Sequence, residues 1–176
     1  MKATETKLKG CFILEPEVFK DERGYFFESY NHKEFCEALG QEINFVQDNQ
    51  SFSKKGVLRG LHFQKGEHAQ AKLVSVLEGR IQDVVVDLRK NSPTFGKHLS
   101  IELNSENKKQ LFVPRGFAHG FLTLSNFATV FYKCDNYYNK EAEGHIFYDD
   151  SNLKIKWKID SRELLLSEKD STDTGI

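Results

Sequence analysis

The sequence is poor in cysteine and in long apolar runs. Its 176 residues include three cysteines, Cys11, Cys36 and Cys134, and no two of them form a CxxC pair. An odd, scattered set argues against a disulfide framework and indicates free thiols in a reducing compartment. No apolar stretch is long enough to cross a membrane, and the apolar run at 11–14 is too short for a signal peptide. We therefore expect a cytoplasmic protein with no membrane partner.

An excess of charge of one sign is also missing. The 25 basic and 26 acidic residues leave a formal net charge of −1 at pH 7, so no overall field draws the protein toward nucleic acid. A site for an anionic ligand would have to be local. There are three prolines, no internal repeats and no Pro/Gly-rich linker, so no domain boundary is visible. The sequence predicts a single domain spanning residues 1–176.

Aromatic residues and short strand-like segments are abundant. Fifteen Phe and six Tyr suit strands. Asn31 as a cap, Glu34 three residues later and Gly40 as a stop predict one helix. The other segments predict an all-β sandwich or barrel with a few short helices. The expected strands are 11–19, 24–30, 43–52, 56–63, 70–77, 80–89, 97–103, 109–113, 118–124, 127–134 and 144–148.

Two histidine segments resemble the two motifs of the cupin superfamily, which forms jelly-roll barrels. The first contains His62, and the second is Pro114-x-Gly116-x-x-His119. Metal-binding cupins have His-x-His and then Glu in the first motif, whereas Gln64 stands two residues after His62 here. Two histidines fall short of the three or four ligands of a catalytic transition-metal site. We therefore expect no metal, and an imidazole that is free to move protons.

Strand periodicity places several polar side chains on inward faces. Lys72 and Tyr132 each share a strand face with apolar residues. Arg59 and His62 lie on opposite faces of a regular strand, so both can serve one pocket only if Gly60 marks a bulge. A neutral His can abstract a proton next to a carbonyl, and a Lys can stabilise the enolate. A Tyr can return a proton, an Arg can clamp a phosphate, and none of these steps needs a cofactor.

Each of these residues also has an ordinary structural explanation. Lys72 could extend its ammonium to water at a strand end. Tyr132 could be a core aromatic whose hydroxyl is hydrogen-bonded. His119 could simply pack between Phe117 and Phe121, and His62 could be a satisfied core residue.

Many segments, in order along nearly the whole chain, resemble the dTDP-4-dehydrorhamnose 3,5-epimerases. The resemblance implies a cupin-type jelly roll, usually a homodimer, that inverts carbons 3 and 5 of a 4-keto-6-deoxy sugar carried on dTDP, within dTDP-L-rhamnose biosynthesis. The segments that carry it are Asp21–Gly24, Phe26–Tyr30, Phe45–Asn49, Arg59–Gln64, Gln70–Val74, Ser92–Gly96, Gly116–Gly120, Tyr132-Lys133, Asn136–Tyr138 and Leu166–Asp170.

The resemblance also implies a role for each matching residue. His62 would be the general base, Asp170 would orient it, Tyr132 would be the general acid and Lys72 would stabilise the enolate. Arg59 and His119 would bind the diphosphate and sugar, and Gln47 and Asn49 would lie along the nucleotide and sugar. Tyr138 would stack on the thymine, with Glu143 and Lys169 nearby. Arg23 and Glu28 would belong to the neighbouring subunit's site.

Other functions fit parts of the same pattern. A related enzyme could epimerise carbon 3 alone, act as a 3,4-ketoisomerase or use another nucleotide sugar. A non-catalytic cupin that binds a sugar would show no proton exchange. A metal-dependent cupin oxygenase or isomerase would lose activity on chelation.

Overall fold

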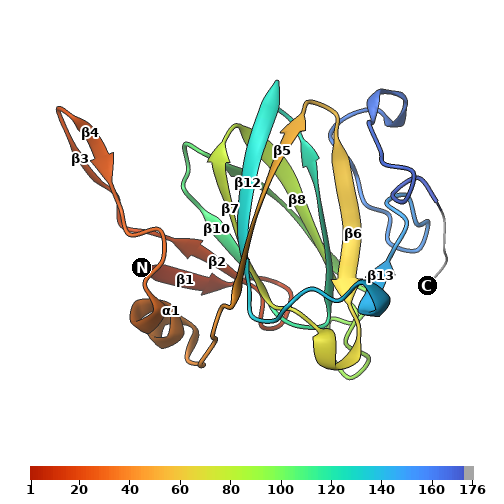
Figure 1. The fold of residues 1–176 in the computed structure, drawn as a ribbon, viewed down its shortest axis with the longest axis horizontal. Coiled ribbons are helices and arrows are strands. Elements are labelled where there is room, and N and C mark those ends of the chain that lie inside the picture. The colour runs from red at the N-terminus through yellow and green to blue at the C-terminus, as the bar shows by residue number, and fades with distance from the viewer. Residues whose placement is uncertain (173–176) are drawn as a thin grey trace.

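The computed structural model of the protein describes residues 1–172, which form an antiparallel β-sandwich with one α-helix (Figure 1). One sheet has the order β1 (Lys2–Glu5), β2 (Phe12–Glu15), β10 (Gln110–Val113), β7 (Lys72–Glu78), β12 (Phe127–Cys134), β5 (Gln47–Lys54). The other has the order β13 (Glu143–His145), β6 (Leu58–Gln64), β11 (Phe117–Thr123), β8 (Arg80–Asp87), β9 (His98–Asn104). A separate ribbon pairs β3 (Phe19–Asp21) with β4 (Gly24–Phe26).

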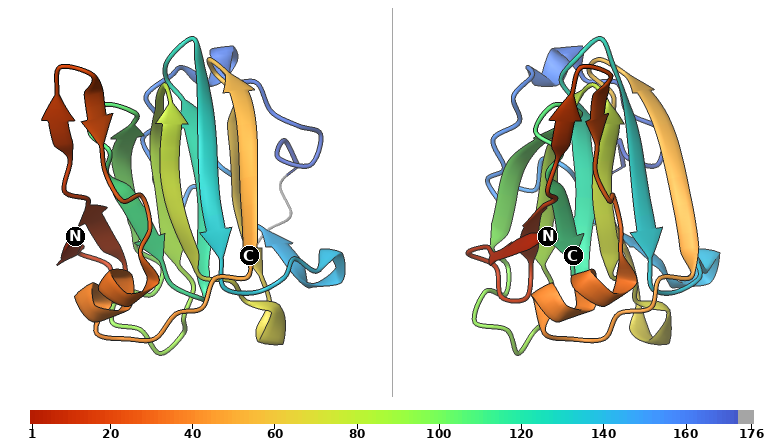
Figure 2. Two further views of the ribbon diagram at one scale, coloured as in Figure 1. Left: turned by 60° about the vertical axis from the view of Figure 1, so that its left-hand side comes forward. Right: turned by 90° about the vertical axis from the view of Figure 1, so that its left-hand side faces the viewer.

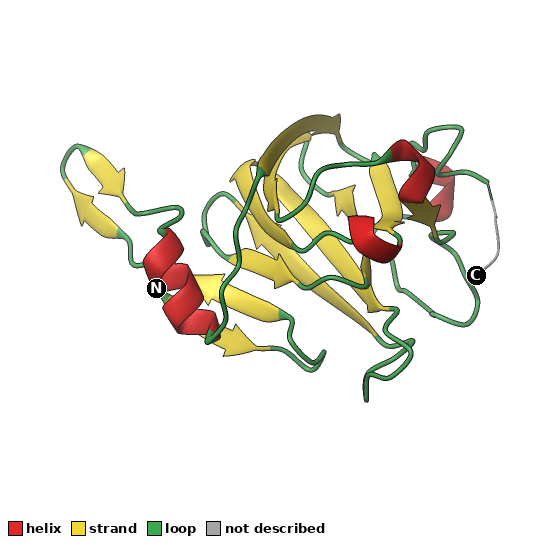
Figure 3. Ribbon diagram, turned by 60° about the horizontal axis from the view of Figure 1, so that its bottom comes forward, coloured by secondary structure: helices red, strands yellow, loops and turns green. Residues whose placement is uncertain are grey.

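The helical segments are short and lie outside the sheets (Figure 3). They are the helix α1 (His32–Leu39) and the 3-10 turns η1 (Gly66–His68), η2 (Lys140–Ala142) and η3 (Ser161–Glu163). The helix begins as predicted, because the Asn31 side chain accepts a hydrogen bond from the Glu34 amide. It ends as predicted at Gly40, whose φ of 68° is left-handed. Among the described residues no helix is long and apolar enough to span a membrane.

The two sheets face each other and share one apolar core (Figure 2). Val74 and Val130 reach into it from the first sheet, and Ile81 and Val85 from the second. The predicted all-β sandwich with a few short helices is therefore confirmed.

Strand β8 is buried on both faces, so its central acidic residue, Asp83, cannot reach solvent on either side. Val84 and Val86 pack outward against Ile146 and Leu153 of the C-terminal part of the chain, which runs beside β6 in Figure 1. Because side chains alternate along a strand, Asp83 is left facing the interior. It is fully buried there.

The bulge predicted at Gly60 is confirmed. His62 pairs with His119 and Arg59 with Phe121, so three steps along β6 match two along β11. Gly60 has a φ of 121°, and a Cβ added there would lie 2.5 Å from the Gly120 Cα. Only glycine fits this close approach, and the extra residue turns Arg59 toward the same side as His62.

Several predicted strand limits were wrong near the N-terminus. The segment 24–30 is a strand only to Phe26, and 11–19 is split between β2 and β3. Beyond Phe26 the chain leaves the exposed β3–β4 ribbon, which projects from the sandwich in Figure 1, and has no strand beside it. Strand β1 was not predicted, because three of its four residues are exposed and it lacks apolar alternation.

Candidate active site

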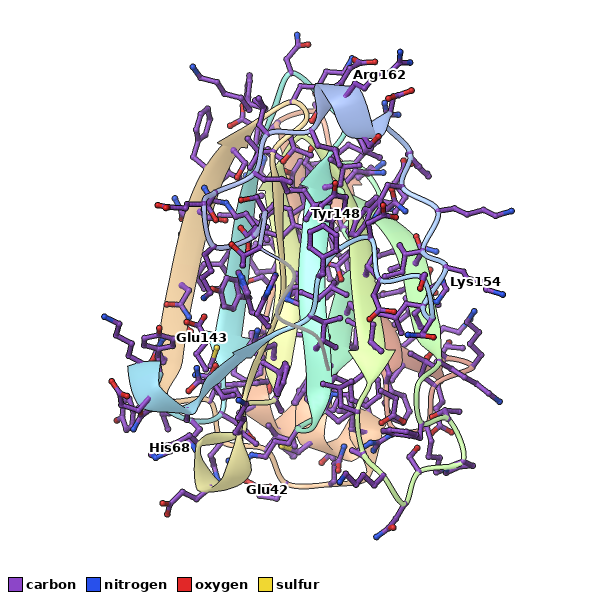
Figure 4. The ribbon with its side chains drawn as sticks, turned by 90° about the vertical axis from the view of Figure 1, so that its right-hand side faces the viewer. Glu42, His68, Glu143, Tyr148, Lys154 and Arg162 are labelled. Atoms are coloured by element: carbon purple, nitrogen blue, oxygen red, sulfur yellow. The ribbon has the colours of Figure 1, made fainter. Side chains whose placement is uncertain are left out.

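A cavity of about 230 Å³ opens between the two sheets and contains His62. The first sheet contributes residues from β5, β7 and β12, and the second from β6 and β13. Glu143 on β13, labelled in Figure 4, comes from the same end of the molecule as His68 of η1. The lining residues are Gln47, Asn49, His62, Phe63, Gln64, Gln70, Lys72, Tyr132, Tyr138 and Glu143.

His62 is held by a carboxylate from the C-terminal segment. Its Nε2 lies 2.7 Å from Asp170 Oδ1, and Asp170 is buried. The Ser167 hydroxyl donates to the other carboxylate oxygen at 2.8 Å. Burial alone would raise the pKa of Asp170, but the hydrogen bonds from His62 and Ser167 hold it below its ordinary value. Asp170 therefore stays ionised beside the imidazole, and Nδ1 of His62 is the ring nitrogen left for a ligand.

The C-terminal segment reaches His62 because it is anchored to the start of β6. Leu165 forms an isolated parallel bridge with Val57. Its amide donates to the Gly56 carbonyl at 2.8 Å, and its carbonyl accepts from the Leu58 amide at 3.1 Å. Residues that look like a polar tail in the sequence are thus fixed next to the pocket.

Tyr132 and Lys72 lie on the sheet opposite His62. The Lys72 Nζ is 5.7 Å from the centre of the Tyr132 ring. Burial raises the pKa of Tyr132 and lowers the pKa of Lys72. The phenol therefore holds its proton firmly, while the ammonium is poorly hydrated and available to a developing negative charge.

His119 is part of a second histidine–carboxylate pair. Its Nε2 lies 2.9 Å from Asp83 Oδ2, both side chains are buried, and His119 does not line the cavity. Sequence reasoning missed Asp83, although an acidic residue within the apolar run of β8 was a usable signal. Arg59 does not line the cavity either, and its Nε donates to the Ser53 hydroxyl at 3.0 Å.

The outer part of the cavity is built around Glu143. Tyr138 donates its hydroxyl to Glu143 at 3.1 Å, and Lys169 forms an ion pair with the same carboxylate. The Tyr138 amide donates to Gln47 Oε1 at 3.0 Å, which fixes the loop that carries the ring. Tyr138 is 51% exposed and lines the cavity, so it can contact a planar ligand.

Arg23 and Glu28 are not brought to this cavity within one chain. Arg23 is exposed on the projecting ribbon and pairs with Asp21. Glu28 is exposed and accepts from Asn31 at 3.4 Å. Within the described residues neither side chain lines the cavity that contains His62.

One cluster near His62 has metal-binding atoms. His62, His145 and Asp170 offer ligand atoms within 4.8 Å of one another. His145 stands opposite His62 in the β13–β6 pairing, with ring centres 5.7 Å apart. Burial and the neighbouring His62 lower the pKa of His145. Sequence reasoning missed His145, because nothing local shows which strand pairs with β6.

Comparison with known proteins identifies the family. The family model described as dTDP-4-dehydrorhamnose 3,5-epimerase matches residues 5–175. The chain is 53% identical over 171 residues to the enzyme of that name from Salmonella typhimurium, covering 97% of this chain and 93% of that one.

Solved structures support the same family assignment. The crystal structure of dTDP-4-dehydrorhamnose 3,5-epimerase from Elizabethkingia anophelis has a TM-score of 0.95 at 61% identity, covering 98% and 94% of the two chains. The 3,5-epimerase from Legionella pneumophila, solved with dTDP-4-keto-L-rhamnose, has a TM-score of 0.92 at 48% identity, covering 97% and 89%. The cupin-type jelly roll expected from the sequence is thereby confirmed, and the chain belongs to the dTDP-4-dehydrorhamnose 3,5-epimerase family.

Proposed function

We propose that the protein converts dTDP-4-dehydro-6-deoxy-D-glucose to dTDP-4-dehydro-L-rhamnose by inverting carbons 3 and 5. One observation carries the proposal. His62 on one sheet, paired with Asp170 of the C-terminal segment, faces a phenol and a lysine on the other sheet, across a cavity that has an exposed tyrosine at its mouth. A base and an acid on opposite faces of a ring are what an inversion requires.

The first step is proton abstraction by His62. Both reacting carbons flank the 4-keto group, which acidifies their protons. In the chair of a glucose-configured sugar the hydrogens at carbons 3 and 5 are axial on the same face, so one base can remove both in turn. His62 accepts each proton at Nδ1, while Asp170 accepts a hydrogen bond from Nε2 and stabilises the imidazolium.

The next step places negative charge on the 4-oxygen. Lys72 stabilises this enolate, and the low hydration of its ammonium strengthens the interaction. Tyr132 then donates its phenolic proton to the opposite face of the same carbon. Inversion results because the proton leaves on one face and returns on the other. These steps use only side chains of the chain itself, so we propose that no cofactor or metal takes part.

The nucleotide part of the substrate extends toward the cavity mouth. Tyr138 stacks on the thymine, and Glu143 and Lys169 hold the phenol and the loop beside it. Gln47 and Asn49 on β5 lie along the nucleotide and the sugar. The family resemblance assigns Arg59 and His119 to the diphosphate and sugar region. The Gly60 bulge turns Arg59 inward, and His119 on β11 pairs with His62 on β6.

We also propose a homodimer in which Arg23 and Glu28 complete the partner's site. Phe19, Tyr25 and Phe26 on the projecting ribbon are all more than half exposed, which supports burial against a second chain. Mixing inactive Arg23→Ala protein with inactive His62→Asn protein should restore activity, because a mixed dimer then has one intact site. Failure of a refolded mixture to regain activity would remove the shared site.

Residues 1–176 act as one domain, in the cytoplasm, with neither nucleic acid nor membrane as a partner. The small net charge supports the absence of a nucleic-acid partner.

Incubation of enzyme and dTDP-4-dehydro-6-deoxy-D-glucose in deuterium oxide tests the reaction. Proton NMR should show deuterium at both carbon 3 and carbon 5. Label at carbon 3 alone would establish a 3-epimerase instead, and no label would leave a sugar-binding protein.

A further inference from the structure

Three side chains with metal-binding atoms meet at α1, away from the cavity between the sheets. His32 Nε2 lies 2.8 Å from Glu42 Oε1, and Cys36 Sγ lies 3.9 Å from each nitrogen of the His32 ring. All three ligand atoms fall within 4.8 Å of one another. Figure 1 shows α1 across the molecule from β6 and β13. We propose that His32, Cys36 and Glu42 form a zinc-binding site that has no part in the epimerase chemistry.

The local backbone fixes all three residues. His32 and Cys36 are four residues apart on α1, so their side chains lie on the same face one turn apart. Glu42 is outside the helix, and the left-handed turn at Gly40 brings it back. The Gln41 amide donates to the Cys36 carbonyl at 3.2 Å, which holds this turn against the helix. The three ligands therefore sit on a hydrogen-bonded frame.

Side-chain rotations bring the three ligand atoms from the observed distances to those of a tetrahedral ion. With Zn–N, Zn–S and Zn–O bonds of about 2.0–2.3 Å, a tetrahedral site separates nitrogen from sulfur by about 3.6 Å and nitrogen from oxygen by about 3.4 Å. The nitrogen–sulfur distance is already within a few tenths of an ångström of this value, but Sγ lies equally far from Nδ1 and Nε2, so the Cys36 side chain must rotate toward the Nε2 side to bond the ion. The His32–Glu42 hydrogen bond must open by about 0.6 Å, which a rotation of the exposed Glu42 side chain supplies.

The ring of His32 has a partner on its other nitrogen. The Tyr30 hydroxyl lies 3.1 Å from Nδ1. Tyr30 is held by ring contacts with Phe35 and Phe45. Metal-bound histidines usually donate their other N–H to such a partner, which fixes the tautomer. With Nδ1–H donating to Tyr30, Nε2 presents its lone pair to the ion.

The donor set selects the class of metal. One thiolate, one imidazole and one carboxylate suit zinc, whereas Mg²⁺ and Ca²⁺ prefer oxygen ligands alone. The side chains of His32 and Glu42 are 44% and 66% exposed, so the fourth position faces solvent and takes a water. Binding displaces the Cys36 thiol proton to the buffer.

Cobalt(II) substitution tests the site. The full chain, reduced with a thiol-free reductant, should bind one Co²⁺ with a thiolate-to-cobalt charge-transfer band and tetrahedral d–d bands, and Zn²⁺ should displace it. Cys36→Ser should abolish the charge-transfer band. His62→Asn should keep it, because the cluster at His62 contains no sulfur. Absence of the band from the unsubstituted protein, or its persistence in Cys36→Ser, would overturn the proposal.

Zinc affinity of three further variants tests the ligand set. In competition with a chromophoric chelator, Glu42→Gln should weaken binding by at least about tenfold, and Tyr30→Phe by about tenfold through loss of the outer hydrogen bond. Glu37→Gln is the matched control, since Glu37 is an exposed carboxylate on the same helix outside the cluster, and it should bind like the unsubstituted protein. Equal affinity in Glu42→Gln and Glu37→Gln would exclude Glu42 as a ligand. Retained epimerase activity in every variant except His62→Asn would show that the chains are folded.

Discussion

Replacing Asp170 with Asn probes the hydrogen bond on which the proposed base depends. Asp170 Oδ1 lies 2.7 Å from His62 Nε2, and Oδ2 accepts from Ser167 at 2.8 Å. An asparagine keeps the shape but loses the charge that stabilises the imidazolium. A hydrogen bond to a charged group contributes about 1.5–3 kcal/mol net, which corresponds to a roughly ten- to 150-fold loss of rate.

A second effect enlarges the loss. If the new amide group donates to Nε2, the ring proton moves to Nδ1, the nitrogen that must receive the substrate proton. In histidine–carboxylate pairs this wrong tautomer costs up to about 10⁴-fold in rate. We therefore expect kcat of Asp170→Asn to fall by about 10²–10⁴-fold, with little change in dTDP affinity.

Two measurements check this expectation. Proton NMR in deuterium oxide gives the exchange rates at carbons 3 and 5, and calorimetric titration gives the affinity for dTDP. A variant that exchanges both protons at more than half the normal rate would refute the role of Asp170 as the residue that orients His62.

Further substitutions test the other parts of the account. Tyr132→Phe should retain exchange but lose inverted product by about 10²-fold or more; full product formation would exclude the phenol as the acid. Burial lowers the pKa of Lys72, so activity should fall as pH rises through a Lys72 pKa that lies below the ordinary lysine value. Lys72→Arg should move this fall to higher pH, and an unchanged profile would contradict the assignment. Gly60→Ala should lower the free energy of unfolding in urea by about 3 kcal/mol, because the added methyl meets the backbone of Gly120. The control Gly66→Ala has nothing near its Cβ and should lower it by about 1 kcal/mol. Equal losses in the two variants would argue against the close approach at the bulge.

The sequence was most informative where the signal is local. Strand periodicity placed Lys72 and Tyr132 on inward faces, and a glycine between Arg59 and His62 indicated the bulge. These features depend on neighbouring residues in one strand, so no knowledge of the sheet order is needed.

Features that depend on distant segments could not be predicted in this way. Asp170 reaches His62 only because Leu165 bridges to β6, and the resemblance alone pointed to it. His145 faces His62 through the pairing of β13 with β6, and Asp83 meets His119 through the pairing of β8 with β11. Such contacts follow from the order of strands in the sheet, which short-range patterns do not encode.

The central claim is that His62 removes a proton from each carbon that flanks the ketone. Measuring exchange in deuterium oxide for His62→Asn, together with dTDP affinity, tests it most directly. We predict that exchange at carbons 3 and 5 falls together by about 10³-fold while dTDP binds as before. Continued exchange at either carbon would contradict the claim.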